Sequence, residues 1–270
     1  MSDPTEEFSS AVRRSGVPPV GHIVLASPGT RNALSLKMLR ALRSELEAAT
    51  ADDAVRVIVL EGEGPAFSAG HDLKEITMHR ADADQGRAFF ESLMAECAAL
   101  MQGIVACPKP VIAQVDGVAT AAGCQLVASC DLAIASDTSR FATPGVNIGL
   151  FCSTPMVALS RNVSRKHAME MLLGGEFIDA QWAAAIGLIN RSVPSAELTV
   201  AVEQLAQRIA GKSRVTLEFG KRAFYEQLEL DLATAYEHTS RVMVENLLTR
   251  DSEEGIGAFV EKRAPVWRDA

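Results

Sequence analysis

The chain has 270 residues, of which 48% are hydrophobic and 22% charged, and its formal net charge is -8 at pH 7. A chain of this length and apolar content can bury one large core, so we expect one main domain with an appendage. The acidic balance argues against a nucleic acid or an anionic membrane as a partner. No apolar run approaches the ~20 residues of a spanning helix, so no membrane partner is expected.

The N-terminal residues and the cysteines indicate a cytoplasmic location. Residues 1–7 are acidic and contain neither an apolar signal segment nor an arginine-rich transit pattern. The cysteines are odd in number and lie in apolar surroundings, which indicates reduced, packed thiols rather than disulfides. They are Cys97, Cys107, Cys124, Cys130 and Cys152. No CxxC motif or His/Cys cluster suggests a metal site.

The first half of the chain alternates predicted strands and helices. A strand is predicted over residues 20–26, and Ser35 caps a helix through about residue 49, since leucines recur there at helical spacing. A buried strand over 55–60, a helix over 88–107 and a strand over 111–115 follow. The charged stretch at 77–86 is either a mobile lid or a plain solvated loop.

The second half is predicted to be mostly helical. Two short strands are expected at residues 132–135 and 140–142. Helices are predicted over residues 154–161, 164–173, 180–186, 196–210, 213–229 and 232–248. We therefore divide the chain into a core over residues 1–195 and a helical region over residues 196–270.

The stretch Asp116–Asp131, DGVATAAGCQLVASCD, follows the predicted strand over 111–115. Gly117 and Gly123 bracket a run of tiny residues, after which a buried helix is expected. A turn of this kind presents unpaired N–H groups at the positive end of a helix dipole, and small side chains allow close approach. It can therefore hold an anion, or an oxygen that becomes one during a reaction. A tight strand-to-helix connection is the alternative.

A second turn of the same kind lies upstream. The segment FSAGHDLKE, residues 67–75, also follows a predicted strand and also turns at a glycine into a helix-like segment. Two amide-bearing turns, each at the end of an apolar strand, are what a two-donor oxyanion hole requires.

The segments FSAGHDLKE and VATAAGCQLVASCDLAIASD resemble the enoyl-CoA hydratase/isomerase (crotonase) superfamily, and the resemblance runs from Arg31 to Arg263. It implies an α/β fold, a crotonase-like spiral of ββα repeats over residues 1–195. The helical region over 196–270 would then assemble a homotrimer or a dimer of trimers. The implied ligand is an acyl-CoA thioester, so coenzyme A enters as part of the substrate, and no other cofactor is expected.

The resemblance also implies roles for individual residues. The oxyanion-hole amides fall on His71 and Ala122, with Gly123 beside the second. The His71 ring is then structural or a pantetheine contact rather than a base. Coenzyme A contacts fall on Arg31, Ala33, Ala69, His71, Asp72, Leu73, Phe259 and Lys262. The last two would reach a coenzyme A on the adjacent subunit. The alternative for Lys262 is a solvated cation at a helix end.

The chain departs from the superfamily at its two catalytic glutamates, which are replaced by Gln125 and Gly145. A glutamine cannot exchange a proton near neutral pH, and a glycine offers no side chain. General acid–base catalysis contributes about 10²–10⁴-fold, so ordinary hydration should be weak or atypical. The segments AAGCQLVASCD and FATPGVN resemble the enoyl-CoA hydratase domain-containing branch of the superfamily.

Three functions remain open on this sequence. The first is a hydratase-like lyase or isomerase of fatty acid metabolism, in which Gln125, Thr143, Asn147, Cys152 or Ser153 orients water or a bound anion. The second is a decarboxylase of a methylmalonyl-CoA-type thioester, which needs only a stabilised enolate. The third is a non-catalytic acyl-CoA binder. Glutamates restored at positions 125 and 145 are expected to raise hydration.

Overall fold

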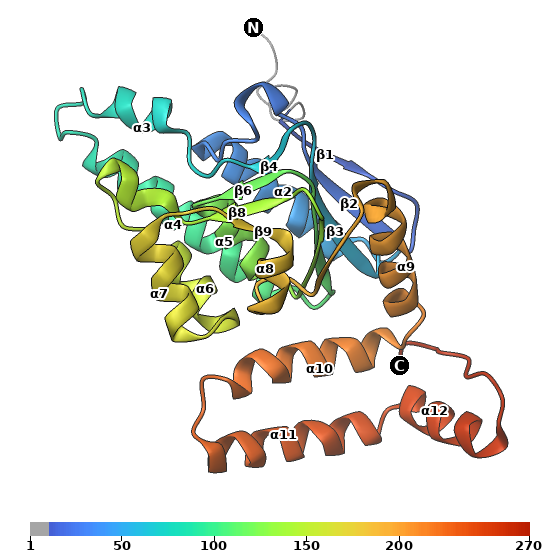
Figure 1. Cartoon of the computed structure of the whole chain (residues 1–270). Coiled ribbons are helices and arrows are strands. Elements are labelled where there is room, and N and C mark those ends of the chain that lie inside the picture. The colour runs from blue at the N-terminus through green and yellow to red at the C-terminus, as the bar shows by residue number, and fades with distance from the viewer. Residues whose placement is uncertain (1–10) are drawn as a thin grey trace, which may run out of the picture.

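The computed structural model describes residues 11–270, whose strands form two sheets (Figure 1). A six-stranded sheet has the order β1-β2-β3-β5-β7-β10, and a four-stranded sheet has the order β4-β6-β8-β9. Neighbouring strands run parallel except at the pairs β1–β2 and β8–β9. The strands are β1 Val12–Ser15, β2 Val20–Leu25, β3 Val57–Gly62, β4 Ala66–Ser68, β5 Val111–Val115, β6 Val118–Thr120, β7 Leu132–Ser136, β8 Arg140–Ala142, β9 Ile178–Asp179 and β10 Arg191–Val193.

The two sheets arise from a repeated unit of two strands. In the pairs β3–β4, β5–β6 and β7–β8, the first strand joins the large sheet and the second joins the small one. A helix follows each pair, which confirms the expected α/β spiral of ββα repeats. The three-residue strands β4 and β6 were not predicted from the sequence.

The helices occupy the predicted parts of the chain, including the helix-like segment after Gly70, and α12 is an addition. At the start of α2, the Ser35 hydroxyl accepts a hydrogen bond from the Met38 amide at 3.1 Å, as the capping prediction requires. The helices are α2 Leu36–Ala51, α3 Leu73–His79, α4 Arg87–Ala106, α5 Ala122–Ser129, α6 Pro155–Asn162, α7 Arg165–Gly174, α8 Ala180–Ala185, α9 Leu198–Ala210, α10 Arg214–Gln227, α11 Leu232–Leu247 and α12 Arg250–Glu261.

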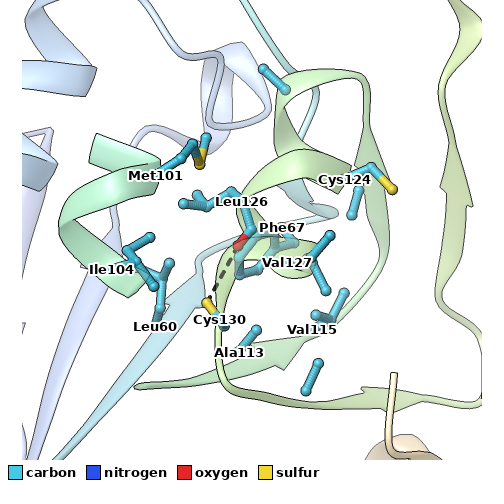
Figure 2. Close-up of a cluster of buried hydrophobic side chains, with 14 of the residues drawn as sticks. Leu60, Phe67, Met101, Ile104, Ala113, Val115, Cys124, Leu126, Val127 and Cys130 are labelled. Atoms are coloured by element: carbon cyan, nitrogen blue, oxygen red, sulfur yellow. Dashed lines mark hydrogen bonds between the residues drawn. The ribbon is translucent and has the colours of Figure 1, made fainter. Parts of the chain in front are cut away.

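Helix α5 lies inside the core, and every one of its residues is buried. Figure 2 shows Leu126 of α5 among side chains of α4 and β4, including Met101, Ile104 and Phe67. Burial of each large apolar side chain of this kind contributes about 1.5–3 kcal/mol. At the far end of α5 the Cys130 thiol donates to the Leu126 carbonyl at 3.3 Å. These contacts fix the position and direction of α5.

Helix α4 is, by length and composition alone, apolar enough to cross a membrane, contrary to the expectation that the chain has no such segment. It packs on α2 and α5, and Leu93, Cys97 and Leu100 on its inner face are buried in the core. These contacts are those of a core helix.

The helical region over 196–270 contains two kinds of helix. Helix α9 packs on the six-stranded sheet, where Val202 and Leu205 contact a cluster that includes Val57. Helices α10, α11 and α12 pack on one another, and Figure 1 shows them below the α/β core.

A part-buried ion pair attaches α10 to the core. The Lys221 Nζ lies 2.7 Å from the Asp131 Oδ2 and donates to the Ile104 and Lys109 carbonyls, each at 3.0 Å. The Tyr225 hydroxyl donates to the other oxygen of Asp131 at 2.9 Å. The Lys221 nitrogen, both Asp131 carboxylate oxygens and the Tyr225 hydroxyl therefore each have a hydrogen-bond partner within the chain.

Candidate active site

The two amide-bearing turns lie side by side because they end neighbouring parallel strands. Strand β4 pairs with β6, so the turns at residues 69–71 and 121–122 leave the same edge of the small sheet. The Thr120 hydroxyl donates to the Ala69 carbonyl at 3.0 Å and ties one turn to the other. The turns end β4 and β6, and not the preceding strands β3 and β5 as the sequence prediction had it.

Glycines make this close approach possible. Gly70 has a φ of +82°, and a Cβ there would lie 3.2 Å from the Ala122 nitrogen and 2.9 Å from the Thr120 carbonyl oxygen. A Cβ on Gly123 would lie 2.3 Å from the Ser68 carbonyl oxygen. Side chains at these positions would push the turns apart, so the glycines set the separation between them.

Neither predicted amide has a hydrogen-bond partner among the described residues. Ala122 is the first residue of α5, so its N–H has no partner within the helix. Across residues 11–270, neither the His71 amide nor the Ala122 amide donates to another group of the chain. The preceding residue, Ala121, has φ 49° and ψ -118°, a conformation that is strained for a non-glycine residue. Strain of this kind and unpaired donors at a helix N-terminus are features of sites that stabilise an oxyanion.

The His71 ring joins two segments of the site. Its Nδ1 lies 3.2 Å from the Leu34 carbonyl oxygen, and since a carbonyl only accepts, Nδ1 carries the proton. Burial lowers the pKa of His71, which keeps the ring neutral near pH 7. Its Nε2 is buried and has no partner among the described residues. The ring thus has a structural contact, while the His71 amide remains available.

Asn32 holds the turn that contains Arg31 and Ala33 against β4. Its Nδ2 donates to the carbonyls of Glu63 at 2.9 Å and Ala66 at 2.8 Å, and the Arg31 carbonyl accepts from the Ala69 amide at 3.0 Å. The Asn32 side chain is fully buried at a φ of +53°. Sequence reasoning did not single out Asn32, although asparagine is the residue that most readily adopts this conformation.

The remaining predicted contact residues fall into two groups. Asp72 caps α3, because its Oδ1 accepts from the Lys74 amide at 2.9 Å, and Leu73 beside it is 49% exposed. Phe259 is 84% exposed and lies on α12, and Lys262 directly follows that helix. Both belong to the C-terminal layer, which consists of α10, α11 and α12. The structure brings Arg31, Ala33, Ala69, His71, Asp72 and Leu73 together in one chain. Phe259 and Lys262 are not brought to them.

Gln125 lies one helical turn after Ala122 and is 5% exposed. The Cys97 thiol of α4 is its side-chain partner, with Sγ 3.8 Å from the Gln125 Oε1. Within residues 11–270 no cluster of His, Cys, Asp or Glu side chains could hold a metal ion.

Gly145 has no room for a side chain. A Cβ at this position would lie 2.8 Å from the Leu150 carbonyl oxygen and 2.9 Å from the Cys152 Sγ. A glutamate could enter only if these atoms moved. The crowding at position 145 argues against a simple gain of hydration when glutamates are restored at both positions, and that gain stays a prediction.

Sequence comparison identifies relatives along nearly the whole chain. The chain is 52% identical over 248 residues to human enoyl-CoA hydratase domain-containing protein 3, mitochondrial, which covers 92% of this chain and 80% of the human protein. The rat and mouse relatives of that name are each 51% identical over 92% of this chain and 81% of their own. Because these relatives are named mitochondrial, the predicted cytoplasmic location is wrong, and the comparison points to mitochondria.

Solved structures agree with this relationship. The human protein's crystal structure has a TM-score of 0.90 at 50% identity and covers 95% of this chain and 100% of its own. An enoyl-CoA hydratase from Mycobacterium smegmatis has a TM-score of 0.91 at 45% identity, over 95% of this chain and 98% of its own. The family model for enoyl-CoA hydratase/isomerase matches residues 18–270. The chain therefore belongs to the enoyl-CoA hydratase/isomerase (crotonase) family, in the branch of the enoyl-CoA hydratase domain-containing proteins.

Proposed function

We propose that this protein binds an acyl-CoA thioester and stabilises negative charge on the thioester oxygen through the His71 and Ala122 amides. The observation that carries the proposal is the pair of unpaired amides at neighbouring strand ends. Preorganised donors of this kind each contribute about 10²–10³-fold to the rate of reactions that develop an oxyanion. Coenzyme A enters as part of the substrate and contacts the Arg31–Ala33 turn, Ala69 and Leu73.

An isosteric backbone change tests the oxyanion hole directly. Lactic acid in place of Ala122 replaces the N–H by an ester oxygen and leaves the side chain unchanged. In the natural protein the infrared band of a bound butanoyl-CoA carbonyl should move to lower frequency, and the ester variant should reduce this shift. Lactic acid in place of Ala180, the first residue of α8, is the matched control and should keep the shift. A bound thioester whose carbonyl band does not move would refute the proposed hole.

The chemistry at this hole is hydratase-like, with weak or atypical hydration. Gln125 cannot exchange a proton, and the space at Gly145 holds the Cys152 thiol and the Leu150 carbonyl. With crotonyl-CoA we expect a hydration rate below ~10⁻³ of an ordinary hydratase, from the loss of two acid–base groups. A faster rate would mean that another group of the chain activates water.

The filled space at Gly145 favours a second candidate, decarboxylation of a methylmalonyl-CoA-type thioester. The bond between Cα and the carboxylate breaks and carbon dioxide leaves. The electron pair of that bond stays with the thioester as an enolate, whose negative charge lies on the thioester oxygen. The enolate then takes a proton from water at Cα. No protein carboxylate is needed to start this reaction. Parallel assays with crotonyl-CoA and methylmalonyl-CoA separate the candidates: carbon dioxide without hydration selects decarboxylation. Binding with neither product selects a non-catalytic acyl-CoA binder.

We also propose that the C-terminal layer assembles a homotrimer or a dimer of trimers. Large apolar side chains of this layer are exposed in the single chain, and such patches mark interaction surfaces. They include Tyr236, Met243, Val244, Leu247, Ile256, Phe259 and Val260. In that assembly Phe259 and Lys262 lie beside a coenzyme A on the adjacent subunit. Sedimentation should give three or six times 28.8 kDa, and Lys262→Met should weaken coenzyme A binding while the mass is kept.

A further inference from the structure

The Cys97 thiol and the Gln125 carboxamide form a buried hydrogen bond between α4 and α5. Cys97 is fully buried, Gln125 is 5% exposed, and the Sγ lies 3.8 Å from the Oε1. The bond joins the helix that begins at the proposed oxyanion hole to the helix that covers it. Neither the oxyanion hole nor the loss of the two glutamates accounts for this contact.

In the structure the carboxamide oxygen is the end of Gln125 that faces Cys97. Burial raises the pKa of Cys97 to about 11, so the thiol keeps its proton near neutral pH and is a donor. A carboxamide oxygen only accepts, and its nitrogen only donates. The bond therefore directs Oε1 toward Cys97 and turns Nε2 the other way.

Helix geometry places the Gln125 side chain relative to the Ala122 turn. Side chains on a helix lean toward its N-terminus, and residues three apart share a face. The Gln125 side chain therefore lies over the turn that begins with Ala122. Among the described residues, Nε2 donates to no acceptor, and it is not among the polar atoms sealed from solvent without a partner.

We propose that Cys97 is a positioning residue that fixes Gln125 as a hydrogen-bond donor toward the acyl group of the bound thioester. The inference rests on the proposed function, since it needs a thioester at the Ala122 turn. A fixed donor favours an acyl chain that carries an acceptor atom near C3 and disfavours one that carries a donor there. In place of the proton-exchanging glutamate of the hydratases, this pocket then has a neutral group of fixed polarity.

Two thioesters of opposite polarity, each compared with an apolar thioester of its own shape, test the inference. In 3-methoxypropanoyl-CoA an ether oxygen at C3 can only accept, whereas in 3-aminopropanoyl-CoA the ammonium group can only donate. Pentanoyl-CoA and butanoyl-CoA are their apolar counterparts. Calorimetry on the full chain gives each dissociation constant, and each polar ligand is compared with its apolar counterpart. The polarity preference is the ratio of these two relative affinities.

Cys97→Ala frees the amide to rotate, so the polarity preference should fall about 3- to 10-fold, the scale of one neutral hydrogen bond. Cys97→Ser keeps a donor and should restore the preference. Gln125→Met should remove the preference. It should also weaken the hydrogen bond of the Cys97 thiol, which is measured as a shift of the Cys97 S–H stretching band in the infrared spectrum. Cys107→Ala is the matched control, because Cys107 is also buried and directly follows the C-terminal end of α4, where its thiol contacts Thr50.

The outcomes separate the inference from the proposed function. If the thioesters bind and Cys97→Ala leaves the polarity preference unchanged while Gln125→Met removes it, Cys97 does not position the amide. If neither variant changes the preference, Gln125 does not face the acyl group. In both cases the inference is overturned and acyl-CoA binding stands. Failure of every thioester to bind would overturn the proposed function and the inference together.

Discussion

The filled space at Gly145 leads to a quantitative prediction for Gly145→Ala. The new Cβ would lie 2.8 Å from the Leu150 oxygen, 2.9 Å from the Cys152 Sγ and 3.3 Å from the Cys152 nitrogen. The thiol can rotate away, but the Leu150 carbonyl is backbone, and the Leu150 amide is itself bonded to the Gly145 carbonyl at 2.9 Å. The loop must therefore shift as a unit. Overpacking of this kind costs about 1–3 kcal/mol.

Thermal unfolding measures this cost. For chains of this size a loss of 1–3 kcal/mol lowers the Tm by roughly 2–10 °C. Cys152→Ala removes one of the crowded atoms, so the double variant should be less destabilised than the sum of the single ones, by about 0.5–1 kcal/mol. Gly174→Ala is the control, because a Cβ there meets no atom within 4 Å.

Two results would refute this reasoning. One is a Gly145→Ala protein that melts with the natural protein, since the Cβ would then have space that the structure does not contain. The other is a gain of crotonyl-CoA hydration in Gly145→Glu, because a carboxylate would then reach the substrate without displacing Cys152.

Three further variants test the packing around the site. Lys221→Met leaves the part-buried Asp131 without its cation, so urea unfolding should show a loss of about 1–3 kcal/mol, and an unchanged midpoint would contradict the role of the ion pair. Ala121→Gly relieves the strain at φ 49° and should raise the free energy of unfolding by about 1 kcal/mol; a loss in urea unfolding would contradict the strain. Burial lowers the pKa of His71 from 6.5, so the unfolded chain binds the proton more readily. The stability that the neutral ring contributes is complete above pH 6.5 and is lost as the pH falls below it. In urea midpoints measured from pH 5 to 8, His71→Asn should remove this part of the pH dependence, and parallel curves would contradict the prediction.

The parts of the site that sequence could predict are those coded by local patterns. The two glycine turns that begin helices can be predicted from a few neighbouring residues. The same is true of the serine that precedes the leucine repeat. Strands β4 and β6 carry no such signal, because three residues are too few to show a period and the two strands that pair are far apart in the chain. Helix α12 was missed although Thr249 caps it and Asp251 lies in its first turn, both recognisable start signals.

The features that set the chemistry of the pocket depend on tertiary contacts. From the sequence, Cys97 is one of several packed thiols. Its contact with Gln125 becomes visible only when α4 and α5 are placed beside each other. From the sequence, Gly145 is a position without a carboxylate, whereas the fold shows that a Cβ there would meet the Leu150 carbonyl and the Cys152 thiol. The sequence shows that a glutamate is absent at position 145. Which atoms surround that position is known only from the fold.

The contact of Gly70 and Gly123 with the opposite turn limits how such a protein can diversify. Each glycine touches the backbone of the other turn, so a substitution in one displaces the donor carried by the second. Selection therefore acts on Gly70 and Gly123 together and not on each glycine separately. New reactions on this scaffold would therefore arise from exchanges along α4 and in the loop around residues 143–152, while the two donors pass unchanged from one descendant to the next.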